Sequence, residues 1–305
     1  MNAVTLNIAG DSDDAFRASV VGASEVAALF DASPWLTRFE LWHRKNGTIA
    51  TPEFGGDERI QAGIFLEPSI IEWACAKYGY EPVERPRRLD NGAGLGGHPD
   101  ALVRCPERGT VGILEVKMVD WLIFKKWGDE PPLNYLLQAQ TYAGLAKVEW
   151  ADIVYTVGGN SLNRHQENAR PELFAKIEAR VAAFWADVRA GIEPKPDYAR
   201  DGRTLVEALG EPTEEVADLR DNLEAEQEAL DFLAAKARRD EAAADMEVAK
   251  TRLIERIGTA GRAMLVGHKI GANRTKDTPD REAKAGEIIK GRRGYRRFDL
   301  KALEN

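Results

Sequence analysis

Residues 96–118, GGHPDALVRCPERGTVGILEVKM, predict a β-hairpin, and this hairpin constrains the fold more than any other stretch of the chain. Its two apolar runs are separated by a turn at 106–109 that contains a proline and a glycine. Both runs should pack their side chains against a core. Three charged residues are unexpected in such a strand pair: Asp100, Glu115 and Lys117.

Side-chain alternation places these three charges together. Along VGILEVKM, Glu115 and Lys117 share one face of the strand, and Val116 points to the other. Counting back through the turn sets Asp100 opposite Glu115 or one residue away from it. The three charged groups therefore converge without any assumption about long-range packing.

The two carboxylates of the hairpin, Asp100 and Glu115, would repel each other unless a cation lay between them. Oxygen ligands without a nearby Cys or His select Mg²⁺ or Mn²⁺, and Mg²⁺ keeps positions open for water and phosphate. An adjacent lysine can orient that water and offset charge on a phosphoryl group. The pattern indicates metal-dependent phosphodiester hydrolysis. The alternative is an ordinary ion pair of Lys117, but buried charges are costly unless they are used.

The composition is that of an ordinary globular protein, with 44% hydrophobic and 30% charged residues among 305. No apolar run is long enough for a membrane span, and no secretory signal is visible, so we expect no membrane association. Cys75 and Cys105 are too few for a disulfide framework or a cysteine zinc site. These features predict a cytoplasmic protein in a reducing cytosol. The net charge of −8 requires that any nucleic acid be bound by local basic surface or through cations.

The first 200 residues predict helices, then a group of strands, then a helix, a strand and a helix. This order is typical of an α/β core with a mixed sheet flanked by helices. Ser24 is the expected N-cap of the helix in GASEVAALFDASPW. The segment GIEPKPDYARDG is rich in proline and charge, so we expect a core domain in 1–200 and an appendage in 201–305.

The appendage divides into an acidic helix and a basic tail. Thr213 can cap a long helix over about 213–257, which is either continuous or folded into a helical hairpin. Residues 251–305 carry a net charge of +7, which leaves −15 for the rest of the chain. Within this tail, AMLVGHKIGANR and GRRGYRRFDL alternate like the two strands of a small basic β-hairpin.

The motif HPD…LEVK resembles the PD-(D/E)XK nuclease superfamily, whose core is the restriction-endonuclease-like fold. The wider pattern is similar to the phage lambda exonuclease / YqaJ-like viral recombinase family. Four separate patches over about residues 15–160 carry this resemblance: GASEVAALFDASPW…LWHRKNG, GIFLEPSIIEWACAKYG, the HPD…LEVK hairpin and NYLLQAQTYAGL. The acidic helix and the basic tail lie outside the shorter family members.

The resemblance implies a set of metal and catalytic residues. Asp100 and Glu115 would ligate Mg²⁺ together with the carbonyl of Val116, and Lys117 would position the attacking water. Glu67 would complete a second metal site, so that two ions are expected, with Mn²⁺ able to substitute. From the helix that follows the hairpin, the active site would be lined by Gln138, with Tyr135 and Gln140 nearby; both glutamines cannot face the same direction, and Gln138 is preferred.

The resemblance also implies a pocket for a terminal 5′ phosphate. Arg17 and Ser24, seven residues apart, match the family residues that hold this phosphate. Independently, a helix N-terminus at Ser24 would suit an anion. His98 stands where family members can carry a hydroxyl residue, and a histidine could still donate to phosphate.

The function expected from the resemblance is a Mg²⁺-dependent 5′→3′ exonuclease that acts on double-stranded DNA ends. Its 3′ single-stranded product would feed phage-type single-strand annealing recombination, with an annealing protein as partner and a homo-trimeric ring around DNA. Two alternatives remain open at this point. One is an endonuclease on the same core, and the other is a non-catalytic DNA-end-binding or scaffolding protein that uses the helical arm.

Overall fold

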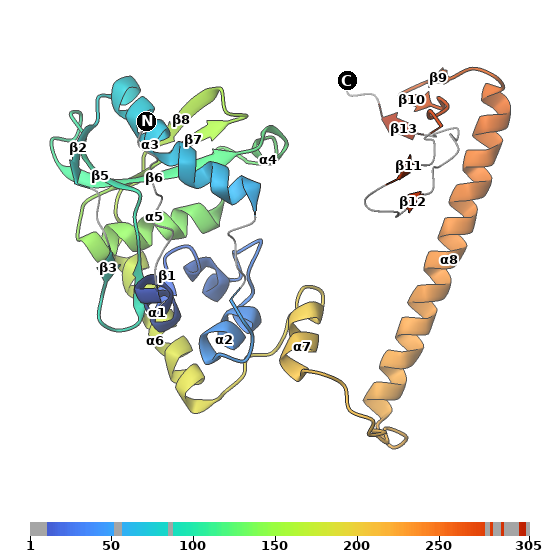
Figure 1. The fold of residues 1–305 in the computed structure, drawn as a ribbon, viewed down its shortest axis with the longest axis horizontal. Helices are drawn as coiled ribbons and strands as arrows, with labels where there is room; N and C mark the ends of the chain where they lie inside the picture. The colour runs from blue at the N-terminus through green and yellow to red at the C-terminus, as the bar shows by residue number, and fades with distance from the viewer. Residues whose placement is uncertain are drawn as a thin grey trace. The chain divides into compact units, whose positions relative to one another are not determined.

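A computed structural model describes residues 11–51, 57–84, 88–277, 281–282, 288–289 and 299–302. The chain forms two compact units, Met1–Thr213 (unit 1) and Glu214–Asn305 (unit 2), and each is described by itself (Figure 1). None of the helices in these described ranges combines the length and apolar character that a membrane span requires.

Unit 1 is built on a five-stranded mixed sheet in the order β2-β5-β6-β7-β8. The predicted hairpin is present as the antiparallel pair β5–β6, and β6 continues into a parallel pairing with β7. The two outer pairs, β2–β5 and β7–β8, are antiparallel. The predicted α/β core with a mixed sheet is therefore confirmed. The strands span Glu81–Glu84 (β2), Ala101–Arg104 (β5), Val111–Val119 (β6), Ala151–Val157 (β7) and Ser161–His165 (β8).

Helices cover both faces of this sheet, which explains why β6 and β7 are almost continuously apolar. On one face, helix α3 (Glu58–Tyr78) packs Ile70 and Ala74 against a cluster that includes Leu114. On the other face, helix α5 (Leu133–Ala146) packs against Ile113. Helix α5 also connects β6 to β7, as a parallel crossover requires. Helix α6 (Pro171–Ala190) packs against α5.

A second, three-stranded sheet holds the N-terminal part of unit 1 against the hairpin. Strand β1 (Val21–Gly22) pairs in parallel with β4 (Leu95–Gly97), and β3 (Leu89–Asp90) pairs with the other edge of β4. Gly96 is required for this close approach, because a Cβ there would lie 2.8 Å from both the Leu89 carbonyl oxygen and the Phe16 ring. The pairing brings residues 21–24 beside the HPD motif.

The helix expected to begin at Ser24 differs from the prediction. Helix α1 (Asp11–Ser19) precedes it, and the predicted segment forms only a five-residue 3-10 helix, η1 (Val26–Phe30). The Glu25 carboxylate accepts a hydrogen bond from the Gly22 amide, and this contact turns the chain before the helix starts. Ser24 is exposed and is not an N-cap, so the helix-terminus argument for an anion at Ser24 is wrong. Helix α2 (Arg38–Asn46) follows, with Thr37 as its N-cap.

Unit 1 continues past residue 200, which the sequence predicted as the end of the core domain. Asp201 is buried and accepts a hydrogen bond from the Thr37 hydroxyl at 2.5 Å, and Arg200 donates to the Ser33 carbonyl oxygen. A short helix, α7 (Gly202–Leu209), then leads to the division after Thr213. These contacts hold the 195–201 segment to the N-terminal helices.

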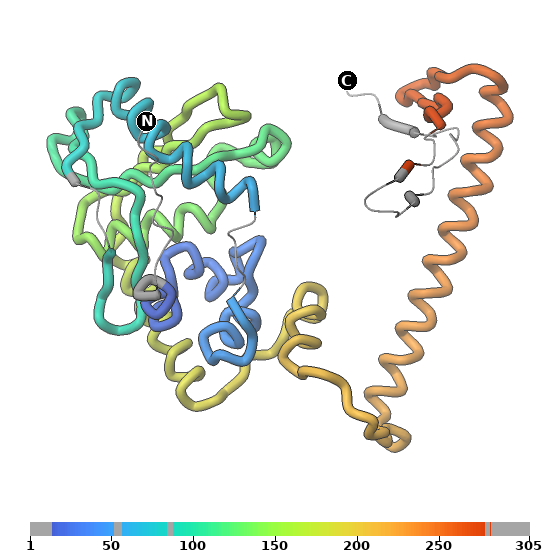
Figure 2. Tube along the Cα trace, viewed as in Figure 1, coloured from blue at the N-terminus to red at the C-terminus, as the bar shows by residue number. Residues whose placement is uncertain are grey.

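Unit 2 contains one continuous helix, α8 (Leu223–Ile257), rather than a helical hairpin, as the trace in Figure 2 shows. It begins ten residues later than predicted, because Asn222 is its N-cap, with the side chain accepting from the Ala225 amide. Thr213 is therefore not the cap. None of the residues of α8 is buried within the described structure.

The basic tail differs in its pairing from the prediction. The segment AMLVGHKIG folds into a hairpin by itself, from β9 (Arg262–Leu265) and β10 (His268–Gly271). The second predicted strand overlaps β13 (Asp299–Ala302), which pairs with the other edge of β10 to make three strands. Most of GRRGYRRFDL lies outside the described residues. A separate pair consists of β11 (Arg281–Glu282) and β12 (Ile288–Ile289).

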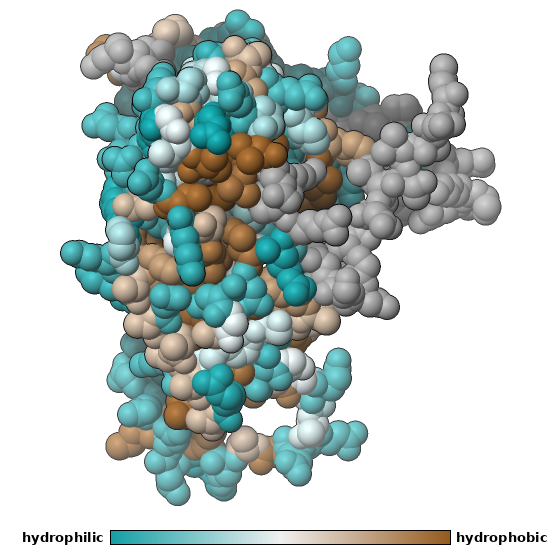
Figure 3. All heavy atoms as spheres, turned by 90° about the vertical axis from the view of Figure 1, so that its left-hand side faces the viewer, coloured by the Kyte–Doolittle hydropathy of each residue, from teal (hydrophilic) through white to brown (hydrophobic). Residues whose placement is uncertain are grey.

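The exposed surface is mixed in character. On the face drawn in Figure 3, hydrophilic side chains predominate at the margins, and hydrophobic side chains gather near the middle. Several large apolar side chains of α3 are among the exposed ones, including Ile60, Ile64 and Phe65. Exposed apolar groups of this kind can mark a binding surface where they adjoin a functional cavity.

Candidate active site

Strand pairing fixes the position of Asp100 relative to β6. Ala101 pairs with Leu114, so the same register continued by one residue sets Asp100 opposite Glu115, as the sequence predicted. The Asp100 carboxylate accepts a hydrogen bond from the Val116 amide at 2.7 Å. The backbone of the strand thus orients one carboxylate of the predicted site.

Glu115 is the most buried ionisable group of the hairpin, with a relative exposure of 1%. Its Oε1 accepts hydrogen bonds from Lys117 Nζ at 2.5 Å and from Gln138 Nε2 at 2.6 Å. Its Oε2 is buried and has no hydrogen-bond partner in the described structure. Burial, and next the negative charge of Asp100, raise the pKa of Glu115 to about 8, although Lys117 opposes the shift. The Lys117 ammonium therefore compensates the buried charge of Glu115 only in part.

Lys117 remains a cation at this site. Burial by itself would lower the pKa of Lys117, but the charges of Glu115 and Asp100 reverse the effect and leave the pKa above its ordinary value. The Lys117 ammonium also lies 5.3 Å from the centre of the Tyr135 ring. These contacts suit Lys117 to electrostatic stabilisation and to holding water, rather than to work as a neutral base.

A cavity of about 270 Å³ is lined by the charged residues of the hairpin and by residues of α3 and α5, the helices on the two faces of the sheet. Glu67 of α3 lines it, and the charge of Glu67 contributes to the raised pKa of Glu115. The other lining residues come from the position before β5, from β6 and α5, and from the first half of α3: Ile60, Gly63, Ile64, Asp100, Glu115, Val116, Lys117, Met118 and Gln138. All five residues predicted as catalytic therefore surround one cavity.

The side chains of Gln138 and Gln140 lie in different surroundings, as their spacing along α5 requires. Gln138 lies in the cavity wall, whereas Gln140 is buried elsewhere and does not line the cavity. The Gln140 amide donates to Glu167 Oε1 and to the Asn168 carbonyl oxygen, and its oxygen accepts from the Arg170 amide. The predicted DNA-binding role of Gln140 is therefore wrong, because its polar atoms are used to tie down the segment after β8.

The residues predicted to hold a 5′ phosphate come from three neighbouring segments. The Ala23 amide donates to the Gly96 carbonyl oxygen at 2.9 Å, so Ser24 follows directly on the β1–β4 pairing that leads to His98. The His98 ring lies 5.5 Å from the ring of Phe16, the neighbour of Arg17 in α1. The backbone therefore gathers the three segments even though Ser24 caps no helix.

Lys45 is a cation beside this group that sequence reasoning missed. Its Nζ donates to the Arg17 carbonyl oxygen at 2.7 Å and lies 2.8 Å from the Glu25 carboxylate. It thus links the last turn of α1 to the turn that holds Ser24. The sequence offered one signal for it, the run of basic residues in WHRKNG, which forms the last turn of α2.

The donor set fits a hard divalent cation with few protein ligands. Within the described ranges, no group of three or more His, Cys, Asp or Glu side chains already stands at metal-holding distances. Asp100, Val116 and Glu115, whose Oε2 is unpartnered, nevertheless line one cavity, and Mg²⁺ commonly uses one or two carboxylates and keeps its waters. A second ion would need the carboxylate of Glu67.

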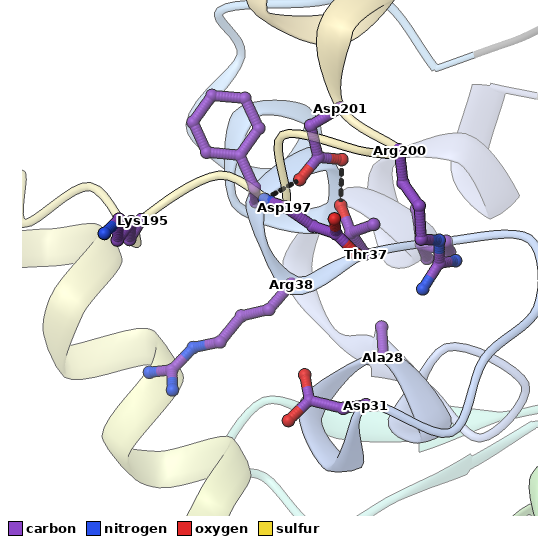
Figure 4. A pocket seen from close by; sticks show the side chains of 10 residues that line it. Ala28, Asp31, Thr37, Arg38, Lys195, Asp197, Arg200 and Asp201 are labelled. Carbon is purple, nitrogen blue, oxygen red and sulfur yellow. Dashed lines mark hydrogen bonds between the residues drawn. The ribbon is translucent and has the colours of Figure 1, made fainter. Parts of the chain in front are cut away.

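A second cavity, of about 210 Å³, contains none of the predicted site residues. It lies between the loop before α2 and the 195–201 segment (Figure 4). Its polar groups bond to one another, since Asp201 accepts from Thr37 and from the Asp197 amide. Arg38 is paired with Asp187 at 2.8 Å. These contacts join the 195–201 segment and α6 to the start of α2.

The fold and the site together define a class. A mixed sheet flanked by helices that presents Asp, Glu and Lys from one hairpin to a cavity is the nuclease-type α/β core that the sequence predicted. Residues 14–149 match the family model of the YqaJ-like viral recombinase domain, the family that the sequence resembles.

Comparison with solved structures gives matches of low sequence identity. An alkaline exonuclease (LHK-Exo) from Laribacter hongkongensis is 24% identical, with a TM-score of 0.49, over 65% of this chain and 100% of that chain. The same exonuclease in complex with dAMP matches at 24% identity and a TM-score of 0.48, over 63% and 97% of the two chains. A phage-related exonuclease from Haemophilus somnus 129PT is 18% identical, with a TM-score of 0.39, over 55% and 82%. No curated protein matches the chain.

Proposed function

We propose that this protein is a Mg²⁺-dependent exonuclease that degrades double-stranded DNA from its 5′ ends and leaves 3′ single-stranded overhangs. The observation that carries the proposal is the convergence of Asp100, Glu115 and Lys117 with Gln138 and Glu67 around one cavity. The YqaJ-like domain over residues 14–149 supports the same activity class.

Each residue has a distinct task in this proposal. Asp100, Glu115 and the Val116 carbonyl hold the first Mg²⁺, Glu67 completes the site of a second, and Mn²⁺ can replace either. The bound ions supply an acidified water and neutralise phosphate charge. Gln138 fixes the Glu115 carboxylate through its 2.6 Å hydrogen bond. Lys117 faces the scissile phosphate as a cation and holds the attacking water in line.

The end of the substrate is recognised at a distance from the reacting phosphate. Arg17 and Ser24 bind the terminal 5′ phosphate, with His98 and Lys45 at the same edge of the small sheet. The Tyr135 ring lies under the Lys117 ammonium and helps to form the entrance through which DNA reaches the site. Anchoring one end in this way would make removal of nucleotides directional.

The cellular setting is part of the proposal. The 3′ overhangs would be passed to a single-strand annealing protein, and three copies of the chain would form a ring around DNA, which accounts for processive digestion. Such a system belongs in the bacterial cytosol and is encoded by a phage or prophage. The support for these statements is the family resemblance of the YqaJ-like domain.

The central test compares wild type with Lys117→Ala on linear duplex DNA in Mg²⁺. We expect nucleotide release from wild type and at least a hundredfold loss in the variant, since one charge-stabilising group is worth roughly 10²–10³ in rate. Lys176→Ala is the matched control, because Lys176 is an exposed lysine of α6 outside the cavity. Equal release by wild type and Lys117→Ala would contradict the role given to Lys117.

Two substrates separate the alternatives. An endonuclease on the same core would nick a covalently closed circular duplex, which an exonuclease leaves intact. A non-catalytic end-binding protein would retain linear duplex DNA in a binding assay and release no nucleotide from it in Mg²⁺ or Mn²⁺.

A further inference from the structure

Helix α4 (Trp121–Phe124) presents an exposed aromatic surface and begins three residues after Met118, which lines the cavity. Trp121 is 54% exposed, and the neighbouring Leu122 and Ile123 are also exposed. The ammonium of Lys125 lies 5.8 Å from the centre of the Trp121 ring. An exposed tryptophan beside a lysine is not needed for packing, and it is the combination that single-stranded nucleic acids use for base stacking.

A cluster of half-buried rings holds this surface in place. Phe124 and Trp127 both pack on Tyr155, with ring centres 5.9 Å and 5.0 Å away. Trp127 also meets Tyr135 edge to face at 5.7 Å, and Tyr135 is the ring under the Lys117 ammonium. The Asp120 carboxylate caps α4 by accepting from the Leu122 amide. The exposed indole is therefore fixed relative to the proposed reaction centre.

Chain geometry limits the distance between the two. Trp121 follows Lys117 by four residues, so their Cα atoms lie at most about 14 Å apart. Met118 of the same strand lines the cavity together with Ile60 and Ile64 of α3. A DNA strand whose phosphate reaches Lys117 has further nucleotides within reach of Trp121, since stacked nucleotides repeat every ~3.4 Å.

We propose that Trp121 is a stacking platform for an unpaired base of single-stranded DNA at the reacting end. The proposal rests on the proposed nuclease function for its location, but its binding can be measured separately. Asp120, Asp129 and Glu130 outnumber Lys125 and Lys126 in this segment. Stacking on the indole face, rather than long-range attraction to phosphate, supplies the affinity, and the platform should keep its effect at high salt.

The test measures fluorescence anisotropy of a labelled thymidine oligonucleotide of about twelve nucleotides, with the full chain in EDTA so that nothing is cleaved. We expect Trp121→Ala and Trp121→Leu to weaken binding about tenfold, because stacking of one base is worth roughly 1–3 kcal/mol. Trp121→Phe should retain most of the affinity. On an oligonucleotide of the same length without bases, wild type and Trp121→Ala should bind alike.

Tyr198→Ala is the matched control, because Tyr198 is an exposed ring with Lys195 at the same 5.8 Å and does not line the cavity. We expect this variant to bind as wild type does. Three results would overturn the platform: unchanged binding in both Trp121→Ala and Trp121→Leu, an equal loss in Tyr198→Ala, or no binding by wild type. If stacking depends on Trp121 but wild type releases no nucleotides in Mg²⁺, the nuclease proposal fails and the platform stands.

Discussion

Gln138 donates a 2.6 Å hydrogen bond to the carboxylate of Glu115, although the two residues lie 23 positions apart. This bond joins α5 to the central strand β6 at the point where the proposed metal ligands meet. It uses the same carboxylate oxygen, Oε1, that accepts from Lys117, and so leaves the buried Oε2 without a hydrogen-bond partner in the described structure. The geometry of the site therefore depends on a helix that the hairpin itself does not contain.

The contrast between the two glutamines of α5 gives the first prediction. Gln138→Leu should reduce nucleotide release strongly, with little loss of stability, because it removes one donor to Glu115 at the cavity. Gln140→Leu should lower the free energy of unfolding by about 1–3 kcal/mol, since it removes the acceptor of the Arg170 amide and one donor to the buried Glu167 carboxylate. Urea denaturation and a nucleotide-release assay, run on both variants, distinguish the two effects. The reverse pattern would contradict the assignment of roles.

The pKa of Glu115 predicts how the stability of the metal-free protein depends on pH. Its pKa is raised in the folded state from 4.5 to about 8, so folding favours the protonated carboxyl. The contribution of Glu115 to the free energy of unfolding is fully present below pH 4.5 and is lost as pH rises through about 8. In EDTA, we expect the melting temperature of wild type to fall between pH 5 and pH 8 relative to that of Glu115→Gln. Parallel curves for the two proteins would show that Glu115 ionises normally.

Metal binding should be visible in stability as well as in activity. Mg²⁺ or Mn²⁺ compensates the buried carboxylates only in the folded state, so it should raise the melting temperature of wild type at pH 8. Asp100→Asn should lose most of this increase, because it removes one of the two carboxylates facing the cation. Differential scanning fluorimetry across a Mn²⁺ titration measures the effect. A full increase in Asp100→Asn would exclude Asp100 as a ligand.

Recognition of a 5′ phosphate can be tested on blunt duplexes that differ only in that group. Wild type should digest the phosphorylated duplex faster and further, whereas Arg17→Ala should treat the two substrates alike. Lys45→Gln should show part of the same loss, since Lys45 bonds to the Arg17 backbone. Arg38→Ala is the control, because Arg38 pairs with Asp187 beside the second cavity. Phosphate-dependent digestion that persists in Arg17→Ala would place the anchor elsewhere.

The extent of unit 1 predicts where the chain can be cut. A protein that ends at Thr213 should fold and, if the nuclease proposal holds, release nucleotides. A protein that ends at residue 200 should be less stable by about 1–3 kcal/mol, because it loses the buried Asp201 carboxylate that accepts from Thr37. Thermal melting of the two proteins measures the difference. Equal stability would mean that Asp201 contributes nothing to unit 1.

The hairpin and its charges could be predicted because they depend on local rules. A turn at 106–109 fixes the register, and the two-residue period of a strand puts Glu115 and Lys117 on one face. The prediction of a helix with Ser24 as its N-cap was wrong because of contacts made by the next residue. Glu25 bonds to the Gly22 amide and to Lys45, and these contacts outweigh the preference of Ser24 for an N-cap.

The sequence by itself determined the α/β class, the convergence of Asp100, Glu115 and Lys117, and the incompatibility of the two glutamines, since all three follow from spacing along a strand or a helix. Only the tertiary structure decided that Gln138 meets Glu115, that Lys45 bonds to the Arg17 backbone, and that the indole of α4 is exposed. These contacts join segments from different elements. Their geometry depends on how helices and sheets pack, and no local period in the chain encodes that packing.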